Sequence, residues 1–124
     1  MIPKFRAWDS VRKKFVEHFF ITDNGLICNM EKPTSGYNSP IPVEKSELIL
    51  MQSTRLKDKN GQEIFEGDIV SIDTDEFDSL FVKYETGIYW LMDNEECVEH
   101  LSDYYKYVSI IGNIYENPDL LEVE

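Results

Sequence analysis

The clearest local pattern in this chain is a β-hairpin at residues 80–92, which read Leu80-Phe81-Val82-Lys83-Tyr84-Glu85-Thr86-Gly87-Ile88-Tyr89-Trp90-Leu91-Met92. Two runs rich in aromatic and β-branched residues, which favour strands, flank the short connector Glu85-Thr86-Gly87. The pattern therefore predicts two antiparallel strands joined by a tight turn.

Similar patterns occur on both sides of this hairpin. Further strands are predicted at residues 4–8, 14–21, 26–28, 48–51, 69–72 and 107–115. Many short strands with almost no helix indicate a mainly β protein, built as a barrel or a sandwich.

Turn residues separate these strands. Asn and Gly tolerate positive φ, so Asp23-Asn24-Gly25 predicts a turn and Asn60-Gly61 a tight two-residue turn. Gly67 is expected to allow a sharp bend before the strand at 69–72. Gly112 is expected to lie where another backbone or a bulge crowds the strand.

A change of period predicts one short helix. Val98, Leu101 and Tyr105 are spaced i, i+3 and i+7, and Asp93 or Asn94 is a suitable helix cap. In this interpretation Cys97 and His100 share one helical face, where they would form a thiolate–imidazole pair or half of a metal site. Zinc needs about four ligands and the sequence has no second Cys/His cluster, so we expect a buried thiol and a surface imidazole.

Residues 31–47 predict a long loop, because prolines and polar residues replace apolar ones there. We therefore expect an N-terminal β-hairpin lobe at residues 1–47, ending in this loop, and a C-terminal lobe at residues 48–124. The lobes would pack together, as two lobes or as one domain, with at most one or two short helices.

Charge is distributed unevenly along the 124 residues, whose formal net charge is −12. Residues 1–59 hold ten basic and seven acidic side chains, giving +3, whereas residues 60–124 hold two and seventeen, giving −15. The acidic half would repel phosphate, so we do not expect nonspecific binding of nucleic acid. The sequence shows no secretory signal and no membrane-spanning stretch, which predicts a cytoplasmic protein with Cys28 and Cys97 reduced and buried.

No catalytic or cofactor motif is evident. The acidic run Asp73, Asp75, Glu76 and Asp78 resembles the start of a calcium loop, but it lacks the glycine and the final glutamate of that motif. The glycines are isolated, so no phosphate-binding loop is predicted. We therefore assign no catalytic, cofactor or metal residues and expect that the protein is not an enzyme.

One basic segment has the composition of a single-strand nucleic-acid site, with cations interleaved with aromatic rings. Its residues are Lys4, Arg6, Arg12, Lys13 and Lys14 together with Phe5, Trp8 and Phe15. The alternative interpretation, which we prefer, is a charged turn over aromatic core residues.

Three sequence blocks, at residues 4–9, 51–70 and 108–121, together resemble the YopX family, which is found largely in phages and prophages. The resemblance implies a β-rich fold with a small SH3-like barrel in the C-terminal part, and often an oligomeric state; it implies no activity. Where the family usually has Thr-Gly-Leu, this chain has Thr54-Arg55-Leu56, which argues against a left-handed backbone at residue 55.

These observations favour a phage-derived, non-enzymatic module that binds copies of itself or another host or phage protein. Two alternatives remain open. The acidic half could mimic DNA and bind a host DNA-binding protein, or the basic N-terminal hairpin could bind single-stranded nucleic acid.

Overall fold

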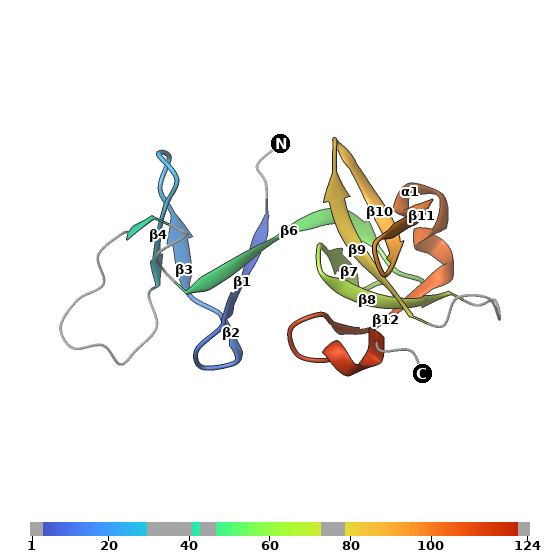
Figure 1. Ribbon diagram of the computed structural model, residues 1–124. Helices are drawn as coiled ribbons and strands as arrows, with labels where there is room; N and C mark the ends of the chain where they lie inside the picture. The colour runs from blue at the N-terminus through green and yellow to red at the C-terminus, as the bar shows by residue number, and fades with distance from the viewer. Residues whose placement is uncertain (1–3, 30–40, 43–46, 73–78, 122–124) are drawn as a thin grey trace. The chain divides into compact units, whose positions relative to one another are not determined.

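The computed structural model describes residues 4–29, 41–42, 47–72 and 79–121, and these are built mainly from β-strands (Figure 1). The strands are β1 (Phe5–Asp9), β2 (Lys14–Val16), β3 (Phe19–Ile21), β4 (Leu26–Asn29), β5 (Ile41–Pro42), β6 (Leu48–Lys57), β7 (Glu63–Phe65), β8 (Asp68–Ile72), β9 (Leu80–Glu85), β10 (Ile88–Asp93), β11 (Glu96–His100) and β12 (Val108–Asn113). Helical turns are short: α1 (Leu101–Tyr104), η2 (Tyr105–Tyr107) and η3 (Pro118–Leu121). None of the helices in the described ranges is long enough to cross a bilayer. The prediction of a mainly β fold is confirmed.

The strands form three sheets. A curled half-barrel in the N-terminal part has the order β2-β1-β6-β7, and an open sheet in the C-terminal part has the order β11-β10-β9-β8-β12. A small sheet has the order β3-β4-β5. All register-defined pairs in these sheets are antiparallel, as hairpin connections require.

The chain divides into two compact units, and each has its own core. The first comprises Phe5–Met51, and its core is formed by Ala7, Val16, Ile27 and Leu48. The second comprises Met1–Lys4 with Gln52–Glu124. Its core is formed by Ile64, Val70, Ile72, Leu80, Val82, Leu91, Leu101 and Val108.

The C-terminal part, where an SH3-like barrel was expected, is an open five-stranded sheet. The α1 residue Leu101 is fully buried in the core beside this sheet. The free side of β12 is bonded to the turn after β6, because the Lys59 N–H donates to the Val108 carbonyl at 2.9 Å.

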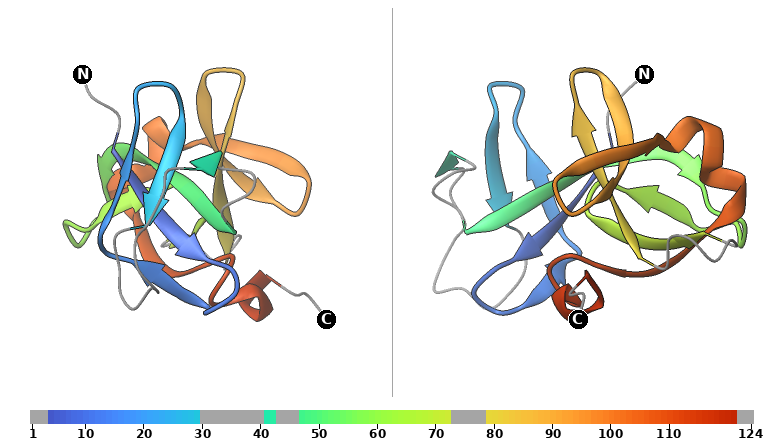
Figure 2. Two further views of the ribbon diagram at one scale, coloured as in Figure 1. Left: turned by 90° about the vertical axis from the view of Figure 1, so that its left-hand side faces the viewer. Right: turned by 45° about the vertical axis from the view of Figure 1, so that its right-hand side comes forward.

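The hairpin predicted at residues 80–92 is confirmed: strands β9 and β10 are antiparallel and joined by a tight turn (Figure 2). Glu85 pairs with Ile88, and the two intervening residues, Thr86 and Gly87, have φ of 54° and 86°. Two positive φ values define a type I′ turn, whose twist matches that of the flanking strands. Strands β9 and β10 therefore form a regular scaffold.

The helix predicted from residue 93 is wrong in position. Asp93 pairs with Glu96 across a second tight turn, and strand β11 follows, so the helix begins only at Leu101. A β-bulge interrupts the pairing of β11 with β10. Val98 packs on the core from β11 and Leu101 from α1, so their spacing of three spans a strand–helix junction and imitates helical periodicity.

Other boundaries also differ from the sequence predictions. The strand expected at 14–21 is divided into β2 and β3 by a bend, and the strand expected at 107–115 ends at Asn113. At Asn60-Gly61 the Gly61 N–H donates to the Asp58 carbonyl, so Gly61 follows the turn rather than occupying its centre. The predicted loop 31–47 and the acidic run 73–78 lie largely or wholly outside the described residues.

Arg55 adopts a left-handed backbone, with φ of 65°, so the expectation that a non-glycine residue would avoid this conformation is wrong. The register of β6 against β7 is irregular here, between Ser53 and Lys57. The Ser53 hydroxyl accepts the Arg55 N–H at 2.9 Å, and the Thr54 hydroxyl accepts the Leu56 N–H at 3.1 Å. These side-chain hydrogen bonds hold the conformation without a glycine.

Candidate functional site

A group of tyrosines around Glu66 is the candidate functional site, and we call Tyr84, Tyr89, Tyr115 and Glu66 the tyrosine cluster. Tyr84 and Tyr89 face each other across β9 and β10, with ring centroids 4.9 Å apart and an interplanar angle of 60°. Tyr89 packs on the C-terminal core, whereas the Tyr84 side chain is 46% exposed. One member of the pair therefore packs on the core, and the other is open to solvent.

Glu66 is held beside this pair by its backbone neighbours. Its N–H donates to the Gln52 carbonyl, and the Gly67 N–H donates to the Val82 carbonyl at 2.8 Å. Gly67 has φ of 94°, which a residue with a side chain rarely adopts, and the bend brings the chain from β7 into β8. The Glu66 carboxylate then accepts the Tyr84 N–H in a long hydrogen bond of 3.5 Å.

Two phenols of the cluster, those of Tyr89 and Tyr115, have raised pKa values. Burial raises the pKa of Tyr89 above 10.0, and the Glu66 carboxylate and Tyr84 raise it further. Burial and then Glu66 raise the pKa of Tyr115 in the same direction. The Tyr89 hydroxyl donates to the Ser53 carbonyl at 3.4 Å. Such phenols bind and orient groups, and they do not act as bases at neutral pH.

A second polar group in the same unit has a structural role. Lys4 Nζ lies 2.7 Å from Glu63 Oε1, and the Ser53 hydroxyl donates to Glu63 Oε2. Hydrogen bonds from Lys4 and then Ser53 lower the pKa of Glu63 below 4.5. The ion pair joins the start of the chain to β7.

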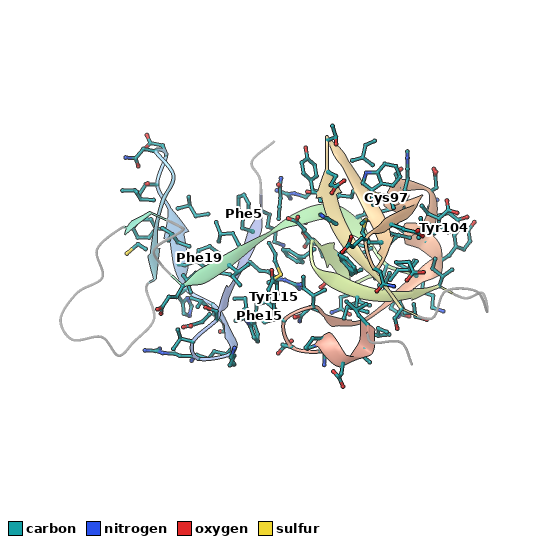
Figure 3. The ribbon with its side chains drawn as sticks, in the orientation of Figure 1. Phe5, Phe15, Phe19, Cys97, Tyr104 and Tyr115 are labelled. Carbon is teal, nitrogen blue, oxygen red and sulfur yellow. The ribbon has the colours of Figure 1, made fainter. Side chains whose placement is uncertain are left out.

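Cys97 and His100 lie on strand β11 rather than on a helix, so the predicted shared helical face is wrong. The His100 ring packs edge-on against Trp90, with centroids 4.4 Å apart. Cys97, which is labelled in Figure 3, is exposed, contrary to the expected buried thiol. Cys28 is buried as predicted, and neither cysteine is in a disulfide. Within the described ranges, no three His, Cys, Asp or Glu side chains gather to hold a metal ion.

The residues of the basic segment predicted from the sequence do not all belong to one compact unit. Trp8 is 3% exposed and packs edge-on against Phe15, 5.0 Å between centroids, so its ring is not open to a base. The Arg6 guanidinium lies over the Phe15 ring at 4.9 Å. Arg12 and Lys13 are exposed in the β1–β2 turn, whereas Lys4 belongs to the other unit and pairs with Glu63.

Sequence reasoning missed the tyrosine cluster. The sequence carries part of the signal, because Gly67 predicts a bend next to Glu66 and the predicted hairpin contains both Tyr84 and Tyr89. What was missing was the long-range approach of Glu66 to Tyr84. That approach depends on how β7, β8 and β9 pair.

Comparisons with known proteins agree on one family. The model of the family described as YopX protein matches residues 4–122. The crystal structure of protein EF1440 from Enterococcus faecalis is 32% identical and has a TM-score of 0.69, with 98% of this chain and 99% of that chain covered. The crystal structure of protein yopX from Bacillus subtilis is 22% identical, with a TM-score of 0.62 and coverage of 97% and 96%. No curated protein matches the chain significantly.

Proposed function

The chain belongs to the YopX family, and we propose that it is a non-enzymatic module that binds other protein chains through its C-terminal unit. The observation that carries the proposal is the half-exposed Tyr84 ring, packed on Tyr89 beside the Glu66 carboxylate. Tyrosine is enriched in protein interfaces because it supplies a large apolar ring with a polar tip and few rotatable bonds. A regular hairpin that presents such a ring is suited to binding another protein chain.

The chemistry of the cluster supports binding rather than catalysis. Nucleophilic catalysis needs a nucleophile beside a base, and the raised phenol pKa values remove Tyr89 and Tyr115 from either role at neutral pH. We include in the proposal the phage or prophage origin and the cytoplasmic location in a bacterial host that the family resemblance implies.

The proposed partners are further copies of this chain, or a host or phage protein. Salt distinguishes these partners. Copies with a formal net charge of −12 repel each other, so their association would strengthen as salt screens that charge. Binding to a basic partner would weaken with salt.

A second candidate, a DNA-mimicking binder of a DNA-binding protein, is favoured by the acidic side chains of the β10–β11 hairpin. Glu95, Glu96 and Glu99 form no ion pair with any residue in the described ranges. This candidate predicts capture of a basic protein at low salt and its release at high salt.

Light scattering and intact mass measurement on the full chain test the proposal. The assembly mass of the wild type is compared with that of Tyr84→Ala, with Tyr107→Ala as the matched control because Tyr107 is 58% exposed on η2. We expect Tyr84→Ala alone to weaken assembly, by about tenfold or more in dissociation constant. If the wild type is a monomer, the same variants are compared for binding to a protein captured from infected cells. Equal behaviour of the two variants contradicts the proposal.

A further inference from the structure

We propose that Glu66 and the rings of Tyr84 and Tyr89 together bind the guanidinium group of an arginine side chain from a protein partner. This inference rests on the proposed function and specifies what the candidate site recognises. Its basis is the combination of the exposed Tyr84 ring, the adjoining Tyr89 ring and a carboxylate that has no ion-pair partner among the described residues.

The geometry provides the two interactions that a guanidinium makes best. The Tyr84 and Tyr89 rings are inclined at 60° with centroids 4.9 Å apart, so they do not stack flat on each other. The Tyr84 ring is 46% exposed, and a planar cation stacks on such a face. Glu66 lies beside Tyr84, and a carboxylate accepts two parallel hydrogen bonds from a guanidinium.

The charge balance of the unit leaves Glu66 available. Lys4 is paired with Glu63 at 2.7 Å, and Lys83 is paired with Glu85 at 3.0 Å. Glu66 forms no ion pair with any residue that the structure describes. The carboxylate therefore lacks a counter-charge of the chain's own among those residues, while the acidic surroundings attract cations from solution.

Cation–π contacts also occur elsewhere in the described residues. Arg6 lies over the ring of Phe15 at 4.9 Å, and Lys106 lies over the ring of Tyr105 at 5.7 Å. The tyrosine cluster has the aromatic half of this arrangement and adds an anion. An anionic or neutral group would gain less there, because Glu66 repels the first and has no charge to attract the second.

Arginine fits better than lysine on chemical grounds. Its guanidinium is planar, forms hydrogen bonds in pairs and is less strongly hydrated than an ammonium group. The Tyr84 side chain is open to solvent rather than enclosed, which suits a side chain extended from a partner's surface.

Chemical-shift titration of the full chain tests the inference. The backbone amide of Tyr84 is the reporter because it faces the Glu66 carboxylate at 3.5 Å. The probes are Nα-acetyl-arginine methylamide, its lysine counterpart and its uncharged citrulline counterpart. We expect the arginine probe to shift the Tyr84 amide saturably, the lysine probe to bind more weakly and the citrulline probe to bind weakest.

Two variants with the same change of charge complete the test. Glu66→Gln should weaken binding of the arginine probe about tenfold, whereas Glu99→Gln on β11 should leave it unchanged. Circular dichroism confirms that both variants fold. Equal binding of arginine and citrulline, no effect of Glu66→Gln, or no saturable shift would each overturn the inference. If Tyr84→Ala nevertheless weakens assembly while Tyr107→Ala does not, the interaction proposal stands and only the arginine assignment fails.

Discussion

The carboxylate of Asp58 accepts the backbone N–H of Ile110 at 2.9 Å, although the two residues are 52 positions apart in the chain. The other carboxylate oxygen accepts the N–H groups of Asn60 and Gln62, each at 2.9 Å. Asp58 is 5% exposed, so these three donors lie mostly away from water. One side chain thus holds the β6–β7 turn and joins it to β12.

Asp58→Ala should therefore be among the most damaging substitutions in the C-terminal unit. It leaves three backbone donors without their acceptor, and we expect a loss of about 3 kcal/mol in the free energy of unfolding. Urea denaturation measures this loss. Asp103→Ala on the exposed side of α1 is the matched control, and an equal effect of the two variants would contradict the role given to Asp58.

Gly112→Ala should destabilise the chain through one neighbour. A Cβ at this position would lie 2.5 Å from Asn117 Oδ1, which accepts the Asn113 N–H at 3.2 Å. We expect a cost of about 1–3 kcal/mol in the wild type and a much smaller cost in an Asn117→Ala background. A double-mutant cycle measured by thermal unfolding checks this, and additive costs would show that the crowding arises elsewhere.

Arg55→Gly should be more stable than Arg55→Ala. Both variants lose the side chain, but alanine retains the strain of a φ of 65° whereas glycine does not. We expect a difference of about 1 kcal/mol in the free energy of unfolding. Urea denaturation of the two variants in parallel measures it. If alanine is the more stable residue at this position, the left-handed backbone is not retained.

Glu63→Gln should reduce stability by about 1 kcal/mol or less near neutral pH, because the Lys4–Glu63 ion pair is partly exposed. The folded pKa of Glu63 lies below 4.5, so its stabilisation is present above pH 4.5 and is lost as the pH falls through the folded pKa. The unfolding curves of wild type and variant should therefore converge in acid. A difference that persists at the lowest pH would exclude the ion pair as its source.

Tyrosine titration should reveal two phenols that ionise late. The pKa values of Tyr89 and Tyr115 are raised above 10.0, so their stabilising contribution is present below pH 10 and is lost as the pH rises through the folded pKa values. Glu66→Gln removes a negative charge and should lower both pKa values. Absorbance at alkaline pH follows the ionisation, with Glu99→Gln as the control. Unchanged titration in Glu66→Gln would place Glu66 away from the cluster.

Local sequence signals predicted the local structure well. The Thr86-Gly87 turn and the bend at Gly67 each depend on a positive φ that glycine adopts readily, and Gly112 adjoins a register irregularity in β12, as expected. Of the aromatic residues expected in the core, Trp8 is 3% exposed, whereas Phe5 and Phe15 are only half-buried.

The errors arose where structure depends on distant pairing. Val98 on β11 and Leu101 on α1 both pack on the core across a strand–helix junction, and their spacing imitated a helix. The backbone of β12 forms hydrogen bonds with Asp58 and Lys59 at the edge of the C-terminal sheet, and no local sequence pattern showed this contact. The same limitation hid the tyrosine cluster, because Glu66 and Tyr84 meet only after three strands have paired.

Strand β6 belongs to both compact units, since Leu48–Met51 lies in one and Gln52–Lys57 in the other. No cleavage point therefore separates the two units without cutting a continuous strand. A fragment that begins at residue 52 would also lose Lys4, which supplies the counter-ion of Glu63. Dissection of this protein into independently expressed halves would damage each half, so functional work on either unit is best done by point substitution in the intact chain.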